Sequence, residues 1–157
     1  MAPEIISSSP QAVGAMTDRA RSVIALNIEA LQALERTIDG SLARACDVIL
    51  SRPGYVVVTG MGKSGHIGGK IAATLASTGT NAFFVHPAEM SHGDLGMLRG
   101  DTTLLAISSS GESRELRDPL LFCERNDIPV IGMTQRGSSF LARMSAVPLV
   151  MPSVAEA

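Results

Sequence analysis

Two side chains that could bind an anion, Lys63 and Ser64, lie in the glycine-rich stretch 60–65 (GMGKSG), directly after an apolar run. Glycines such as Gly62 and Gly65 let the backbone approach a ligand closely. The N–H groups at the start of a following helix attract negative charge, and lysine and serine add a cation and a hydroxyl. The stretch therefore predicts a phosphate-binding loop.

A second polar stretch, 108–113 (SSSGES), places three hydroxyl candidates around a glycine: Ser108, Ser110 and Ser113. Hydroxyl-rich turns often only cap the next helix, and that alternative is open for this stretch taken alone. If it lies beside Lys63 and Ser64, hydroxyls and amides converge on one place, which favours a phosphate site. Hydroxyl donors in place of an arginine cluster indicate a small phosphorylated metabolite.

Two histidines, His86 and His92, lie with two carboxylates in the glycine-bounded loop 86–96 (HPAEMSHGDLG). Imidazoles and carboxylates are competent metal ligands, but their spacing matches no standard metal signature. Structural or substrate-contact roles are the favoured interpretation, and a metal at His92 is the alternative. The acidic residues Glu112 and Glu115 are equally open to two interpretations, since acids are favoured at a helix start without any chemical role.

Two nucleotide-binding motifs resemble the first stretch and fail on detail. The pattern G-x-G-x-x-G fits residues 60–65, but a dinucleotide site also needs an acid at the end of the second strand, where the sequence reads Val85-His86. A P-loop would need glycine at Val57, inside the first strand. We therefore expect no nucleotide cofactor.

The elements that must position these residues alternate between strands and helices. Strands are expected at 55–59, 81–85, 102–108, 129–134 and 147–151, with helices at 66–77, 113–125 and 139–144 between them. Right-handed crossovers then give an α/β fold, a doubly wound five-stranded parallel sheet flanked by helices. Ligands of such sheets bind at the carboxyl ends of the strands, near the switch in strand order. An amphipathic helix at 11–37 and a second helix at 41–50 precede the sheet.

Composition limits the class of protein. The 157 residues fit one domain at 11–157 after a mobile tail at 1–10. A net charge of -2 without a dense basic stripe argues against a nucleic-acid partner. No apolar run is long enough for a membrane helix, and no signal peptide is evident, so a cytoplasmic location is expected. Cys46 and Cys123 lie in apolar helical segments and are expected to be buried.

Five strings of the sequence together resemble the arabinose 5-phosphate isomerases, members of the sugar isomerase (SIS) domain group, over a range from about Val13 to the last residue. They are 60–68 (GMGKSGHIG), 76–80 (ASTGT), 83–87 (FFVHP), 92–96 (HGDLG) and 108–115 (SSSGESRE). The fold of that group is a five-stranded parallel sheet between helices, as expected above.

The resemblance implies interconversion of ribulose 5-phosphate and arabinose 5-phosphate through an enediolate, without a cofactor, for the Kdo sugar of lipopolysaccharide or capsule. Ser64, Ser108, Ser110 and Ser113 look like the phosphate-binding hydroxyls. Lys63, Glu115 and Glu156 look like the polar catalytic set, and His92 looks like a substrate-site histidine. Gly62, Gly65 and His86 are expected to contact the substrate from their loops.

The resemblance also leaves alternatives. Members of the group continue beyond the position of Glu156 into a further helix with a histidine and usually a pair of CBS domains, so the sequence is expected to be an isolated, shortened SIS domain whose activity is open. A noncatalytic phosphosugar-binding module and an isomerase of another phosphosugar are the rival interpretations. A homo-oligomer, dimer or tetramer, built partly on the 11–37 helix is expected, with a small phosphosugar as the other partner.

Overall fold

The computed structural model describes residues 9–154 and divides the chain into two compact units, one of residues 37–151 and one of residues 1–36 with 152–157. The larger unit is an α/β structure. Its strands are β1 (Val56–Gly60), β2 (Ala82–Phe84), β3 (Thr103–Ile107), β4 (Val130–Thr134) and β5 (Val147–Val150). Its helices are α2 (Gly40–Leu50), α3 (Gly62–Ser77), α4 (Pro87–Ser91), α5 (Arg117–Arg125) and α6 (Phe140–Met144), with 3-10 turns η1 (Asp94–Met97) and η2 (Arg114–Leu116).

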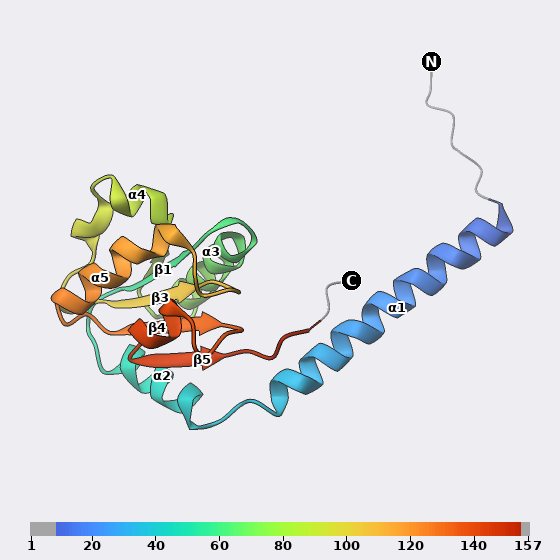
Figure 1. Cartoon of the computed structure of the whole chain (residues 1–157), viewed down its shortest axis with the longest axis horizontal. Coiled ribbons are helices and arrows are strands. Elements are labelled where there is room, and N and C mark those ends of the chain that lie inside the picture. The colour runs from blue at the N-terminus through green and yellow to red at the C-terminus, as the bar shows by residue number, and fades with distance from the viewer. Residues whose placement is uncertain (1–8, 155–157) are drawn as a thin grey trace, which may run out of the picture. The chain divides into compact units, whose positions relative to one another are not determined.

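The five strands form one parallel sheet in the order β2-β1-β3-β4-β5 (Figure 1). The chain passes from β1 to its neighbour β2 and then returns across β1 to β3, so strand order switches between β1 and β3. Gly60 at the end of β1 is in register with Ile107 at the end of β3. The predicted five-stranded parallel α/β sheet is confirmed.

Alternating side chains of each strand bury into two separate hydrophobic layers, as expected for a sheet covered on both faces. Val57 and Leu104 pack with α5 and α6 residues such as Leu120 and Leu141 on one face. Val58 and Leu105 pack with α2 and α3 on the other. Figure 1 shows α5 and α2 on opposite sides of the strands. The layers hold the strand ends, and the loops that follow them, in fixed positions.

Two predicted boundaries were wrong, and both corrections change the site. The helix expected from His66 begins at Gly62, so only Met61 separates β1 from α3. Glycines are tolerated in this first turn because its N–H groups make no intrahelical bonds in any sequence. The 86–96 segment, expected to be a loop, contains α4 and η1. Helix α4 starts there because His86 caps it and Pro87 occupies its first position.

The smaller unit contains α1 (Pro10–Glu35), which confirms a long helix in the predicted place. None of the α1 residues, all of which are described, is buried. Its apolar side chains include Met16, Ile24 and Leu31, which are 63%, 60% and 65% exposed. Within residues 9–154, no helix combines the length and the apolar composition needed to cross a membrane.

The two cysteines differ in their surroundings. Cys123 is buried as expected, and burial raises the pKa of its thiol to about 12. Cys46 is exposed, so the expectation that it is buried was wrong. It lies on α2, whose one buried residue among those described is its neighbour Ala45. A helix that covers a sheet with one stripe exposes the adjacent position, whatever its hydrophobicity.

Candidate functional site

The predicted anion-binding segments flank the point where strand order switches. A methyl group placed on Gly60 would lie 3.0 Å from the Ile107 carbonyl oxygen and 3.1 Å from the Ser64 carbonyl oxygen. The first turn of α3 therefore lies against the end of β3. Ser108 is the residue that follows β3 in the sequence. The sheet brings Lys63 and Ser64 to the same edge as the serine stretch, as ligand sites of doubly wound sheets require.

The start of α3 offers backbone donors at this edge. Met61 is its N-cap, and no side chain of the described chain makes a capping hydrogen bond to its first turn. Because α3 is 16 residues long, its aligned peptide dipoles place partial positive charge at these N–H groups. The side chain of Lys63 is exposed and that of Ser64 is half-buried. This turn can bind an anion through amides, a hydroxyl and an ammonium group.

The serine stretch forms a tight loop held together by its own hydroxyls. The Ser108 side chain is 3% exposed, and its Oγ accepts a hydrogen bond from the Gly111 N–H at 3.1 Å. The Ser108 and Ser113 Oγ atoms are 2.9 Å apart and share a hydrogen bond. Ser110 Oγ accepts from the Glu112 N–H at 3.2 Å and is exposed. Ser110 thus presents its hydroxyl to solvent, while Ser108 is engaged inside the loop.

The alternative interpretation, in which the serine stretch only caps the next helix, does not fit Ser113. Ser113 occupies the N-cap position of η2, but within the described chain its side chain makes no capping hydrogen bond there. Its hydroxyl turns back to Ser108 instead. The loop geometry thus places two hydroxyls and the first amides of η2 together.

The serine loop is also fixed to the segment between β4 and α6. The carbonyl oxygen of Ser109 accepts from the Gln135 N–H at 3.0 Å and from the Thr134 hydroxyl at 3.2 Å. Ser109 Oγ donates to Gln135 Oε1 at 3.0 Å. The Leu141 N–H donates to the Gly111 carbonyl oxygen at 3.0 Å. A loop with this many long-range bonds is ordered before any ligand binds, which lowers the entropy cost of binding.

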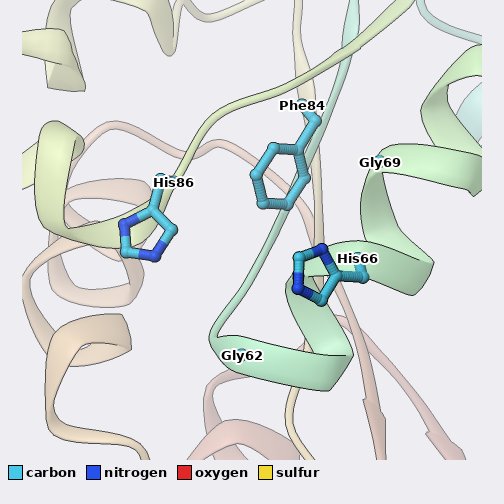
Figure 2. A pocket seen from close by; sticks show the side chains of 6 residues that line it. Gly62, His66, Gly69, Phe84 and His86 are labelled. Atoms are coloured by element: carbon cyan, nitrogen blue, oxygen red, sulfur yellow. The ribbon is translucent and has the colours of Figure 1, made fainter. Parts of the chain in front are cut away.

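A pocket of about 360 Å³ opens beside the first turns of α3. It is lined by Gly62, Gly65, His66, Gly69, Phe84 and His86. Figure 2 shows the imidazole rings of His66 and His86 pointing toward each other across it, with the Phe84 ring between them at one side. Three of the residues predicted to contact substrate, Gly62, Gly65 and His86, therefore line one pocket, whereas none of the described serines lines it.

His86 has a defined tautomer in this pocket. Its Nδ1 accepts a hydrogen bond from the Ala88 N–H at 3.3 Å, which caps α4. A nitrogen that accepts from an N–H carries no proton, so the neutral ring holds its proton on Nε2. His86 is half-buried, and Nε2 is left as a hydrogen-bond donor.

The other predicted residues are less confined. His92 is the exposed C-cap of α4 and is not among the residues that line the pocket. Glu115 lies in η2, directly after the serine loop, and its side chain is exposed. Glu156 lies outside the described residues. Across residues 9–154, no three His, Cys, Asp or Glu side chains come close enough together to hold a metal ion.

Sequence reasoning missed three residues that the fold brings to the site. His66 and Phe84 line the pocket, and Gln135 holds the serine loop. His66 could have been found, because it lies four residues after Gly62 and therefore on the same helical face. Phe84 and Gln135 come from the ends of other strands, and no local pattern marks them.

Comparisons with known proteins show which family the chain is similar to. The SIS domain family model matches residues 49–157. An arabinose 5-phosphate isomerase of Francisella tularensis is 50% identical over 127 residues, which are 79% of this chain and 39% of that protein. The corresponding protein of Pseudomonas aeruginosa is 48% identical over 130 residues, which are 83% of this chain and 40% of that protein. The chain therefore spans about two-fifths of the length of the curated relatives it matches.

Solved structures with a similar fold include proteins with bound phosphosugars. A protein of E. coli CFT073 in complex with arabinose 5-phosphate superimposes with a TM-score of 0.78 at 38% identity, covering 89% of this chain and 76% of that one. The NanR protein of Vibrio vulnificus, complexed with ManNAc-6P, has a TM-score of 0.79 at 24% identity over 92% of this chain and 55% of that one. The second likeness shows a shared fold alone.

Proposed function

The chain belongs to the SIS domain family, and we propose that its site interconverts arabinose 5-phosphate and ribulose 5-phosphate. The observation that carries the proposal is that the two predicted anion-binding segments, one at the start of α3 and one after β3, both lie at the strand switch. The relatives named as arabinose 5-phosphate isomerases support the choice of substrate. We place the reaction in the cytoplasm, where it would supply arabinose 5-phosphate for Kdo.

In this proposal the phosphate is bound by hydroxyls and amides from both segments. Ser110, exposed at the tip of its loop, and Ser64 donate directly to the phosphate oxygens. Ser113 and Ser108 can contact the phosphate once they give up the hydrogen bond between their Oγ atoms. The partial positive charge at the start of α3 adds to the attraction, because its amides are uncapped by any described side chain.

The reaction needs a base and a donor at the other end of the substrate. A carboxylate removes the C2 proton of arabinose 5-phosphate, the C–H electron pair forms a C1–C2 double bond, and the C1 oxygen becomes negative. The protonated carboxylate then returns its proton to C1, and the C2 hydroxyl proton moves to the negative C1 oxygen, which gives the C2 ketone of ribulose 5-phosphate. We assign the base to Glu115 and the stabilisation of the negative oxygen to Lys63. Glu156 and His92 complete the proposed set.

The pocket beside α3 gives His86 a place in this scheme. Its Nε2–H is a neutral donor that can hydrogen-bond a sugar hydroxyl, and His66 faces it from the other side of the pocket (Figure 2). The glycine-lined wall formed by Gly62 and Gly65 leaves room for a narrow, extended sugar chain. We propose that this pocket receives the hydroxyl-bearing carbons of the substrate.

An isomerisation assay tests this function. The wild-type chain should convert arabinose 5-phosphate to ribulose 5-phosphate, measured by the appearance of the ketose, and should bind arabinose 5-phosphate in calorimetry. Ser110→Ala should bind it at least tenfold more weakly, because a hydrogen bond to a charged group contributes about 1.5 to 3 kcal/mol.

Ser138→Ala is the matched control, since Ser138 is an exposed serine outside the loop. Equal affinity of the wild type and Ser110→Ala would contradict the phosphate site. Turnover of a different phosphosugar but not of arabinose 5-phosphate would contradict the choice of substrate.

We also propose that α1 joins copies of the chain into a dimer or tetramer. Its support is the row of exposed apolar side chains that includes Met16, Ile24 and Leu31, because a helix with so wide an apolar face is rarely left in water. Light scattering should then give two or four times the chain mass of 16.4 kDa. Ile24→Asp should lower that mass, whereas Ser22→Asp, on the polar side of α1, should not. A wild-type monomer would overturn the proposal.

A further inference from the structure

Glu112 makes a contact that its position in the serine loop does not suggest. Its Oε1 accepts a hydrogen bond from the Phe140 N–H at 2.9 Å, across 28 residues of sequence. Phe140 is the first residue of α6, and the Arg117 guanidinium lies 4.9 Å from the centre of its ring. The carboxylate therefore connects the loop after β3 to the start of a helix that packs on β4 and β5.

The negative charge of the Glu112 carboxylate is unfavourable beside a site for an anion. In sequence, Glu112 lies between Ser110 and Ser113, two of the residues whose hydroxyls are proposed to bind a phosphate dianion. Like charges 4 Å apart repel by about 1 kcal/mol even in bulk water. A carboxylate that only capped α6 would thus weaken phosphate binding, unless its contact also improves the geometry of the neighbouring hydroxyls.

The neighbouring contacts show how it could. The Glu112 N–H donates to Ser110 Oγ at 3.2 Å, so the backbone of Glu112 occupies an acceptor site of that hydroxyl and leaves its proton free to donate. The preceding residue, Gly111, is anchored to the same helix start through the Leu141 N–H at 3.0 Å. Residues 111 and 112 are thus fixed to two successive amides of α6, one through the backbone and one through the Glu112 side chain.

We propose that Glu112 is a positioning residue that holds the hydroxyls of Ser110 and Ser113 in the geometry that binds phosphate. The inference rests on the proposed function of the serine loop. Ser108 and Gly111 are fixed by buried bonds, whereas Ser110 is exposed and depends on the orientation of the Glu112 backbone. Without the hydrogen bond of the Glu112 carboxylate, the 110–113 segment samples more conformations. Ordering the segment on ligand binding then costs conformational entropy, which weakens binding.

The test compares Glu112→Ala, Glu112→Asp and Glu112→Gln in calorimetric binding of arabinose 5-phosphate to the full chain. Alanine removes the acceptor, and aspartate keeps the charge but is one carbon too short to reach the Phe140 N–H. Both should weaken binding by about 5- to 10-fold. Glutamine keeps the acceptor oxygen and loses the charge, so it should bind within about twofold of the wild type, or more tightly. Glu124→Ala and Glu124→Gln, at an exposed position of α5, are the matched controls and should bind as the wild type does.

The possible outcomes separate the explanations. A charge effect alone predicts tighter binding by both alanine and glutamine, and this result would overturn the positioning role. Faster hydrogen exchange at the Phe140 amide in Glu112→Ala with unchanged affinity would leave a structural cap only, and would also overturn it. If the wild type binds but the aspartate and alanine variants bind equally well, only this inference fails. If the wild type does not bind, the proposed phosphate site fails together with it.

Discussion

Lys63→Ala is expected to lower the turnover of arabinose 5-phosphate by about 10²- to 10³-fold, the usual effect of removing a donor that stabilises a developing negative oxygen. Lys63 lies in the first turn of α3, at the edge of the sheet where β3 ends and the serine loop begins. Its ammonium group is the cation that the proposed mechanism assigns to the enediolate. The measurement is kcat from the appearance of ribulose 5-phosphate, with calorimetry as a separate test of binding.

Glu115→Gln belongs to the same experiment and should lower kcat by about 10²- to 10⁴-fold, because the amide cannot accept the C2 proton. Lys70→Ala and Glu124→Gln are the matched controls. Lys70 is exposed on the same helical face as Lys63, two turns further from the strand ends. Near-normal turnover by both Lys63→Ala and Glu115→Gln, with the controls unchanged, would overturn the catalytic assignment.

Gly111→Ala is expected to destabilise the protein by about 3 kcal/mol or more and to abolish phosphosugar binding. Gly111 has a φ of +66°, which side chains with a Cβ rarely adopt. A methyl group there would lie 2.1 Å from Ser139 Oγ and 2.4 Å from Ser139 Cβ. Ser139 is 2% exposed and caps α6, so it has little freedom to move away. Denaturant unfolding measures the first effect and calorimetry the second.

Gly62→Ala separates the two causes of this destabilisation. Gly62 has a similar φ of +53°, but no described atom lies within 4 Å of a methyl group placed on it. Gly62→Ala should therefore lower the free energy of unfolding only by the cost of a positive φ for alanine, about 1 to 2 kcal/mol. If Gly111→Ala lost no more than Gly62→Ala, the close approach to Ser139 would have no energetic weight, and the loop would be less rigid than the contacts indicate.

Much of the fold could be predicted from the chain. The order of strands and helices follows from apolar runs such as Val56–Val58, separated by segments with helical periodicity, because these patterns depend on local sequence. The errors lie at boundaries. Helix α3 includes the glycines that looked like a loop, and α4 formed inside the 86–96 segment, because a first helical turn is stabilised by what it packs against as much as by its own residues.

The sequence by itself determined which chemical groups are present and at which strand ends they lie: Lys63 and Ser64 after β1, and the three serine candidates after β3. A parallel sheet fixes this, because every strand delivers its following loop to the same edge. Only the tertiary structure decided which of these groups face each other. In the folded chain, the Ser108 hydroxyl is hydrogen-bonded inside its loop, whereas Ser110 is exposed. Glu112 accepts a hydrogen bond from Phe140, and His66 and His86 line the same pocket. These contacts link residues far apart in sequence or depend on side-chain orientation, and no local pattern encodes either.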